Sequence, residues 1–122
     1  MASKMNVAIL VLVLLLLSAV VTVCVERYLR EPLRQKQATQ KVISEVAYAI
    51  ERYRSDHDSW PPVAEGHSSG IIDDQSFHSY IREWPDDGWR VPLRYALPDG
   101  RPEIRSAGAD RKFGTQDDFI YR

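Results

Sequence analysis

The sequence predicts an α+β protein in which one long N-terminal helix packs on a small C-terminal antiparallel sheet. Three observations support this prediction. Residues 7–25 are apolar and carry no charge, residues 42–53 place apolar side chains three or four positions apart, and residues 91–121 contain short strand-like runs separated by turn residues. Because the helical patterns come first and the strand patterns follow, the arrangement is α+β.

The first predicted element is the apolar run VAILVLVLLLLSAVVTVCV at residues 7–25. As a helix, its nineteen residues would span roughly 28 Å, which is close to the hydrocarbon thickness of a bilayer. We therefore expect three segments: a short N-terminus over residues 1–6, a transmembrane helix over residues 7–25 and one folded domain over residues 26–122.

Two alternatives exist for this apolar run. A cleaved signal peptide would begin with a base such as Lys4, but its apolar stretch is only about 7–15 residues and ends at a small-residue cleavage site. A lipoprotein would need a small residue before its cysteine, whereas Val23 precedes Cys24. A retained membrane anchor fits the run best, with Cys24 as a small apolar residue near the helix end.

The helix is expected to kink or restart at Pro32, because proline lacks the N–H that a helix interior uses. Beyond it, charged side chains occupy one helix face and an apolar stripe occupies the other. The stripe consists of Val42, Ile43, Val46, Ala47, Ile50 and Tyr53. The segment Ser59-Trp60-Pro61-Pro62 is expected to end the helix, since two prolines cannot continue its hydrogen bonds.

The rest of the chain is predicted to contain a loop, a short helix and three strands. The loop covers residues 63–70, and the short helix lies within residues 71–84 with Asp74 or Ser76 as its N-cap. Its apolar face would hold Phe77, Tyr80, Ile81 and Trp84. The strands are expected at residues 91–97, 103–106 and 119–121, with a hairpin loop at residues 98–102.

The composition excludes several classes of function. Beyond the apolar run the chain carries 17 acids and 15 bases, so it lacks the basic character of a nucleic-acid-binding protein. No nucleophile–base pattern, phosphate loop or dinucleotide motif is present, which predicts a protein that is not an enzyme. The tryptophans are expected to pack within the small domain rather than to line a groove. They are Trp60, Trp84 and Trp89.

The candidate site lies in SAGADRKFGTQDDFIY, residues 106–121, where Asp110, Asp117 and Asp118 occur in one glycine-containing loop. Hard cations such as Ca²⁺ bind several carboxylate and carbonyl oxygens, and glycines allow a loop to fold back around an ion. The spacing is not that of an EF-hand. The alternative is that these acids are solvated turn residues, and Arg111 and Lys112 in the loop favour that alternative.

Residues 87–122 resemble the C-terminal half of the major pseudopilin of type II secretion systems, the general secretion pathway protein G type. That family typically shows D-P-W-G-N-P, a tyrosine-containing strand, a hairpin, S-L-G-A-D-G, a glycine-rich loop and a closing pair of aspartates. The counterparts here are Asp87, Trp89, Pro92, Tyr95, Ser106, Gly108, Ala109, Asp110, Asp117 and Asp118. Residues 49–62 and 80–85 resemble the family's helix end and the segment before its tryptophan.

The resemblance implies a pilin-like fold and a calcium-braced C-terminal loop. Asp110, Asp117 and Asp118 would supply carboxylates, and the carbonyls of Ala107 and Thr115 would complete the site. It also implies a single-pass inner-membrane protein with its C-terminal domain in the periplasm. The implied partners are other pseudopilins or secretion-apparatus subunits and the membrane lipid, with no nucleic acid.

The chain also departs from the family pattern. Family members carry a glycine before the apolar run, where a peptidase cuts, and a glutamate five residues later. Here no glycine precedes the run and no acid lies within it; counting from Met5, the fifth residue is Ile9. We therefore expect that this chain lacks the usual prepilin leader and its processing. The segment around the tryptophan differs from the family pattern at Gly88, Arg90 and Val91.

Orientation and function leave alternatives at this point. The bases that follow the apolar run outnumber those before it, so the positive-inside rule alone would place the domain in the cytoplasm, whereas the resemblance places it outside. The favoured function is a structural pseudopilin of a type II secretion or type IV pilus-like system. The alternative is a membrane-anchored binding module that never enters a filament, and a membrane-anchored enzyme is a third possibility.

Overall fold

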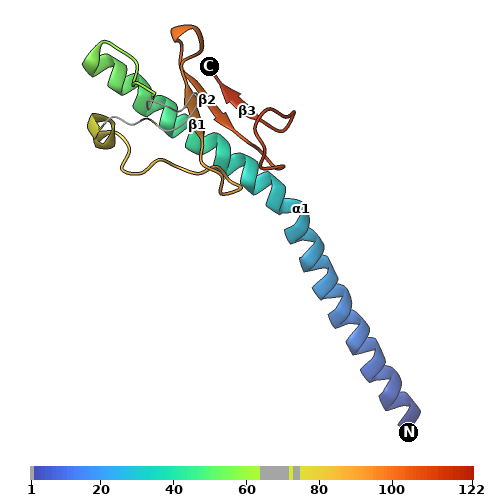
Figure 1. Cartoon of the computed structure of the whole chain (residues 1–122). Coiled ribbons are helices and arrows are strands. Elements are labelled where there is room, and N and C mark those ends of the chain that lie inside the picture. Colours follow the sequence, from blue (N-terminus) through green and yellow to red (C-terminus); the bar gives the residue numbers. More distant parts are fainter. Residues whose placement is uncertain (1, 64–71, 73–74) are drawn as a thin grey trace. The chain divides into compact units, whose positions relative to one another are not determined.

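The structure is a computed structural model that describes residues 2–63, 72 and 75–122 (Figure 1). In chain order its elements are helix α1 (Ala2–His57), 3-10 helix η1 (Gln75–Ser79), strand β1 (Arg94–Ala96), 3-10 helix η2 (Pro98–Gly100), strand β2 (Glu103–Ser106) and strand β3 (Phe119–Tyr121). Contacts divide the chain into two compact units, Met1–Leu33 and Arg34–Arg122. A long helix followed by a small antiparallel sheet confirms the α+β prediction.

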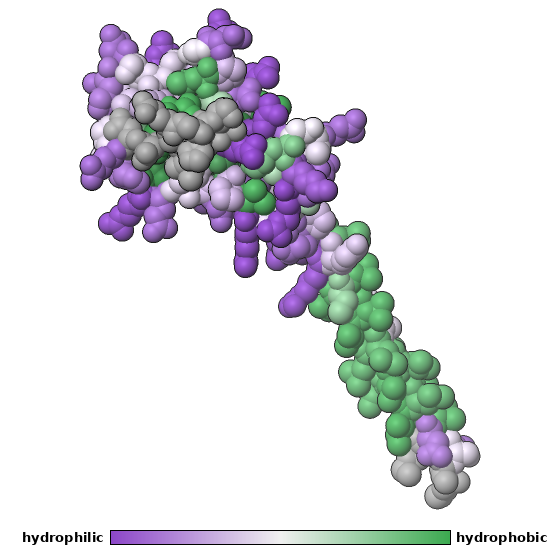
Figure 2. Space-filling view, viewed as in Figure 1, coloured by the Kyte–Doolittle hydropathy of each residue, from purple (hydrophilic) through white to green (hydrophobic). Residues whose placement is uncertain are grey.

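The first unit is the N-terminal part of α1, and its surface is apolar over residues 7–25. The large side chains of residues 7–25 are about half exposed, and Figure 2 shows them as a continuous apolar surface on this part of the helix. The two hydroxyls within the run are satisfied internally: Ser18 donates to the carbonyl of Leu15 at 3.0 Å, and Thr22 donates to the carbonyl of Ser18 at 2.8 Å. In the part of the chain that the structure describes, α1 alone is long and apolar enough to cross a membrane.

The helix was expected to kink or restart at Pro32, and the expected restart was wrong. Helical structure continues across this residue, and α1 runs as one 56-residue helix with Pro32 inside it. Proline removes one N–H from the helical ladder, but the residues on either side keep theirs and can propagate the helix. Pro32 nevertheless lies beside the boundary between the two units, which falls after Leu33.

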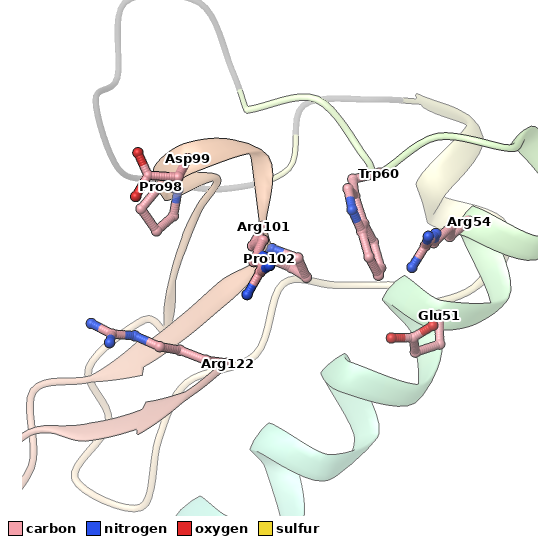
Figure 3. Close-up of a pocket in the computed structure, with 8 residues that line it drawn as sticks. All are labelled: Glu51, Arg54, Trp60, Pro98, Asp99, Arg101, Pro102 and Arg122. Atoms are coloured by element: carbon pink, nitrogen blue, oxygen red, sulfur yellow. The ribbon is translucent and has the colours of Figure 1, made fainter.

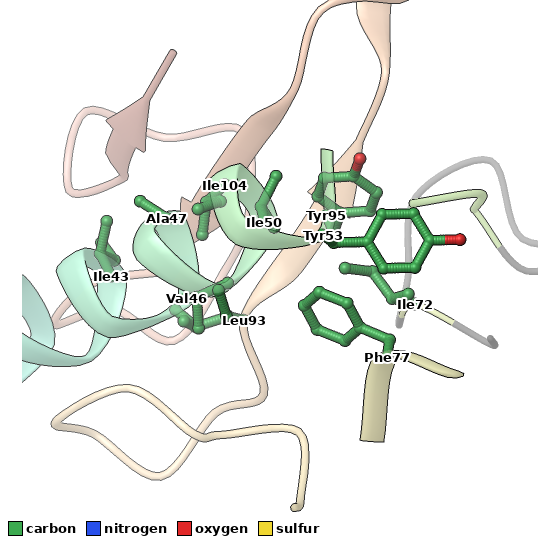
Figure 4. Packing of buried hydrophobic residues seen from close by; sticks show 11 residues of the cluster. Ile43, Val46, Ala47, Ile50, Tyr53, Ile72, Phe77, Leu93, Tyr95 and Ile104 are labelled. Carbon is green, nitrogen blue, oxygen red and sulfur yellow. The ribbon is translucent and has the colours of Figure 1, made fainter. Parts of the chain in front are cut away.

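The second unit is built on the amphipathic part of α1, and its core lies along the predicted stripe. Ile43, Val46, Ala47, Ile50 and Tyr53 are buried there, while Val42 is partly buried. They pack with side chains from η1 and the sheet, as Figure 4 shows. The residues contributed by the rest of the unit are Ile72, Phe77, Leu93, Tyr95 and Ile104.

Helix α1 ends at His57, slightly before the segment expected to stop it. Asp58 adopts a left-handed conformation with φ of 56°, which takes the chain out of the helix. Pro61 then becomes part of the core boundary, because its carbonyl accepts a 2.9 Å hydrogen bond from the buried hydroxyl of Tyr95. The helix therefore ends before the two prolines are reached.

The sheet has the order β1-β2-β3, and both pairs are antiparallel. Strands β2 and β3 have the predicted bounds, whereas β1 covers only Arg94–Ala96 of the predicted residues 91–97. Pro92 has no N–H to donate and forms only an isolated bridge with Asp86. The regular hydrogen-bond ladder with β2 therefore begins at Arg94. The predicted hairpin loop is η2, with Asp99 and Gly100 at positive φ.

The predicted short helix is smaller than expected. It is the 3-10 helix Gln75–Ser79, so only Phe77 of the expected apolar face lies within it. Tyr80, Ile81 and Trp84 follow it outside helical structure, yet all three still pack on the core. The capping candidate Asp74 and loop residues 64–70 lie outside the described residues.

All three tryptophans lie in the second unit and pack there, but Trp60 also lines a surface pocket, which the prediction did not include. Trp84 donates its indole N–H to the carbonyl of Leu93 at 2.7 Å, and the ring of Trp89 lies 5.9 Å from that of Phe119. Trp60 is partly buried against the core. All three rings therefore lie in the second unit and contribute to its packing.

Candidate functional site: the aspartate loop

The aspartate loop, residues 107–118, connects β2 to β3 and is closed by a contact between its two ends. Ala107 is fully buried and Gly108 has φ of +71°. A Cβ atom on Gly108 would lie 1.9 Å from the carbonyl oxygen of Asp117, so only glycine fits. The loop therefore begins and ends at the same point beside the sheet.

Two of the predicted ligands, Asp110 and Asp117, meet near this closure. The Asp110 backbone N–H donates to Oδ2 of Asp117 at 3.1 Å, and Oδ1 of Asp110 accepts from the N–H of Lys112 at 2.9 Å. Hydrogen bonding from Thr115, and then from the Lys112 backbone with its nearby charge, holds the pKa of the exposed Asp110 carboxyl below its usual value. The loop thus stabilises the ionised form of this acid.

The third predicted ligand, Asp118, has a different environment. Its side chain is only 3% exposed, and Oδ2 accepts the Gly114 N–H at 2.8 Å. The same oxygen lies 3.4 Å from Nη1 of Arg105 on β2, which forms an ion pair with it. Asp118 is therefore neutralised by a residue that the sequence analysis did not include in the site.

The structure brings the three aspartates into one loop without gathering them into a ready-made metal cluster. Among the described residues, no three acidic, histidine or cysteine side chains converge closely enough to hold an ion. Thr115 is tied into the loop as well: its carbonyl accepts the Asp118 N–H at 3.3 Å, and its hydroxyl accepts the Asp117 N–H at 3.3 Å. Carboxylate and carbonyl oxygens are the ligands that hard cations prefer, and calcium binding by this loop stays a prediction.

An ion-pair network adjoins the loop on the sheet. Arg105 donates to Oε1 of Glu103 through Nε at 3.2 Å and Nη2 at 2.9 Å, and Arg122 donates to Oε2 at 2.9 Å. Burial alone would raise the pKa of the Glu103 carboxyl, but the hydrogen bonds from both arginines outweigh it and hold that pKa below its usual value. The network ties β2 to the last residue of the chain.

A buried polar network supports the start of the loop. The Asp87 carboxylate accepts from the Ser106 hydroxyl at 2.6 Å, and Oγ of Ser106 accepts the Gly108 N–H at 3.2 Å. Next to Asp87, the Gly88 N–H donates to Oγ1 of the buried Thr39 on α1 at 2.8 Å. Hydrogen bonds therefore connect α1, the turn at residues 86–91 and the start of the aspartate loop.

A surface pocket of about 940 Å³ lies elsewhere on the second unit, between α1 and the hairpin (Figure 3). The Arg54 guanidinium lies 4.2 Å above the Trp60 ring at one side of it. The pocket contains acids as well as bases and offers no nucleophile–base pair among its lining residues. It is lined by Glu51, Arg54, Trp60, Pro98, Asp99, Arg101, Pro102 and Arg122.

Arg105 contacts the loop and Asp87 supports its start, but neither was among the residues predicted for the site. Arg111 and Lys112 are the basic residues within the loop, but the side chain that forms an ion pair with a predicted ligand is Arg105 on β2. The β2–β3 register places Arg105 opposite Ile120, two residues beyond Asp118, so the strand boundaries and the register together could have identified it. Asp87 was matched to a family motif without a structural role.

Comparisons with known proteins define the class and then the family. A search of the solved structures matches the major pseudopilin from the type 2 secretion system of enterohaemorrhagic Escherichia coli, with a TM-score of 0.53 and 20% identity over 71% of this chain and 85% of that one. At this identity the match establishes the fold, which is pilin-like. The family model of type II secretion system (T2SS) protein G matches residues 30–120, and the chain belongs to this family.

The family assignment settles the broad class of function. The chain is a pseudopilin of type II secretion, and this family is structural and not enzymatic, as the sequence predicted. A search of curated proteins found no match. The comparisons do not favour the alternative of a binding module outside a filament.

Proposed function

We propose that the chain is a structural subunit that assembles with other pseudopilins or secretion-apparatus subunits through an inner-membrane anchor. The observation that carries the proposal is the family match over residues 30–120, directly preceded by the exposed apolar part of α1. An apolar helix surface of this length has no partner in the unit itself and is stable in lipid or against similar helices. The anchor is a single pass, and the folded domain lies in the periplasm.

The assembly proposal is tested by co-purification. The full-length chain, tagged at its C-terminus and expressed in a host with a type II secretion system, is cross-linked in the membrane and purified in detergent. Pseudopilins or secretion subunits are expected among the cross-linked partners. A chain whose apolar run is replaced by an unrelated transmembrane helix is the control, and equal capture by both would contradict assembly through α1.

The orientation is tested by thiol labelling, for which Cys24 is first replaced because it is the single cysteine of the chain. Cysteines are then introduced separately at Arg101, on the exposed hairpin, and at Ser3, before the apolar run. An impermeant thiol reagent should label Arg101→Cys in intact spheroplasts, and Ser3→Cys only after lysis. The reverse pattern would place the domain in the cytoplasm, as the Lys/Arg count alone predicts.

Calcium bracing of the aspartate loop is the finer part of the proposal. Asp110, Asp117 and Asp118 would hold the ion with carboxylate oxygens, and Ala107 and Thr115 would add carbonyl oxygens. The carboxylates of Asp110 and Asp117 lie in one closed loop and repel one another, and a divalent ion bound to the folded loop would relieve that repulsion. Binding would then stabilise the folded chain, because the unfolded loop cannot present these oxygens together.

The calcium proposal is tested by thermal unfolding of the full-length chain in detergent, in calcium and in chelator. Tryptophan fluorescence reports the second unit, since all three tryptophans lie there. An ion at a hundred times its dissociation constant should stabilise by about 2.7 kcal/mol. Asp117→Asn should abolish the rise, and Asp99→Asn in the hairpin should preserve it. Identical curves in calcium and chelator would refute the calcium site.

A further inference from the structure

The buried carboxylate of Asp118 already has a cation within the chain. Its side chain is 3% exposed, and a carboxylate removed from water needs an opposite charge as well as hydrogen bonds. The Gly114 N–H supplies one hydrogen bond at 2.8 Å, and Nη1 of Arg105 lies 3.4 Å from the same oxygen. The charge that neutralises Asp118 therefore comes from β2.

Arg105 is held in place for this role by its other nitrogens. Nε and Nη2 both donate to Oε1 of Glu103, and Glu103 is itself anchored by Arg122. Because the guanidinium is planar, fixing one edge also fixes the direction of the remaining nitrogen, which faces Asp118. The pair is thus prepared by the sheet and does not depend on the loop alone.

The neighbouring strand provides a matched arginine with a different contact. The β1–β2 register places Arg94 directly opposite Arg105, and like charges in this position destabilise a sheet. The Arg94 guanidinium instead lies 3.7 Å above the Phe113 ring. Two arginines of the same sheet pair therefore have different neighbours, one an aromatic ring of the loop and the other its most buried acid.

We propose that Arg105 is the internal countercation of the aspartate loop. It neutralises Asp118, keeps the loop and β3 joined to β2 when no metal is bound, and lowers the affinity of the loop for a divalent ion that must share or displace it. The first two statements depend only on the contacts of Arg105. The competition with a divalent ion rests on the calcium site of the proposed function.

The internal pair is tested in chelator with the full-length chain in detergent. Arg105→Gln, Arg94→Gln, Asp118→Asn and the Arg105→Gln/Asp118→Asn double variant are unfolded by heat and followed by tryptophan fluorescence. Arg105→Gln should lower the midpoint by about 4–8 °C more than Arg94→Gln. Its effect should be clearly smaller when Asp118 is already Asn, because only the contacts of Arg105 with Glu103 then remain to be lost. If Arg105→Gln does not fold, Arg105→Lys, which keeps the charge, should retain part of the coupling.

Equal losses for the two arginine variants, or additive losses in the double variant, would overturn the internal pair. The competition is tested by titrating calcium into the same proteins in a calorimeter. Arg105→Gln should bind calcium about tenfold more tightly than the unchanged chain, which corresponds to about 1.4 kcal/mol, while Arg94→Gln should not. Equal affinities would overturn the competition. If no variant responds to calcium but the coupling in chelator is present, the countercation stands and the calcium site fails.

Discussion

The Ser106 hydroxyl donates a 2.6 Å hydrogen bond to Oδ2 of Asp87, and both residues are buried. The other oxygen of Asp87 accepts the N–H groups of Trp89 and Val91 at 2.9 and 3.0 Å. One carboxylate thus organises the turn at residues 86–91 and joins it to the end of β2.

Asp87→Ala should lower the free energy of unfolding by about 3 kcal/mol. The substitution leaves a buried hydroxyl and two N–H groups without their acceptor, and each such group costs about 1–3 kcal/mol. Urea unfolding followed by tryptophan fluorescence measures the loss. The neighbouring Asp86 is exposed and serves as the control; Asp86→Ala should change stability by less than about 0.5 kcal/mol. Equal effects would show that Asp87 does not organise the turn.

Gly108→Ala should destabilise the chain far more than Gly100→Ala. Both glycines have positive φ, 71° and 74°, so both substitutions carry the backbone cost of about 1 kcal/mol. Only at Gly108 would the added Cβ meet a backbone atom, the carbonyl oxygen of Asp117, whereas nothing lies within 4 Å at Gly100. A loss of about 3 kcal/mol or more is expected at Gly108 in the same urea assay. Similar losses at both sites would contradict the closed loop.

Stability should fall as the pH drops below about 4.3, the ordinary pKa of an unfolded Glu. Arg105 and Arg122 lower the folded pKa of Glu103, so its contribution is complete above the unfolded value and is lost as the pH falls through the folded one. Glu103→Gln should flatten the dependence of the unfolding free energy on pH in this window. Arg122→Gln should flatten it partly, because it removes one cause of the shift. An unchanged slope in Glu103→Gln would refute the assignment.

Ile50→Ala should cost about 2–5 kcal/mol, because Ile50 is 2% exposed and lies in the core that α1 shares with the sheet. Tyr48→Ala provides a control on the same helix, since Tyr48 is 66% exposed. Its loss should be within about 0.5 kcal/mol. Urea unfolding of the two variants measures both losses, provided that the slope of the free energy against urea is unchanged. Equal losses would show that the buried stripe does not hold α1 on the sheet.

The sequence predicted the elements whose patterns are local. The stripe on α1 and the strands at Glu103–Ser106 and Phe119–Tyr121 follow from spacing and turn residues, and the structure confirms them. Strand β1 is shorter than predicted because Pro92 interrupts the ladder, and helix η1 is shorter because Tyr80 and Ile81 pack on the core outside helical structure.

The contacts of the aspartate loop could not be predicted from local sequence patterns. The pair Arg105–Asp118 joins residues thirteen positions apart and depends on where β2 ends and how it pairs with β3. Asp87 and Ser106 are nineteen positions apart, and no periodicity connects them. Local patterns located the loop and its acids, whereas the partners of those acids are fixed by tertiary packing.

Because Gly108 and Asp117 are in contact, a change in the length of the loop between them need not affect the strands on either side. The backbone is in close contact at these two residues, so insertions or deletions between them should leave the β2–β3 register intact. A residue inserted between Ser106 and Gly108, or between Asp117 and Phe119, would move one strand past the other and turn its side chains to the opposite face. Related chains should therefore differ in length between the positions of Gly108 and Asp117 and agree in length outside them.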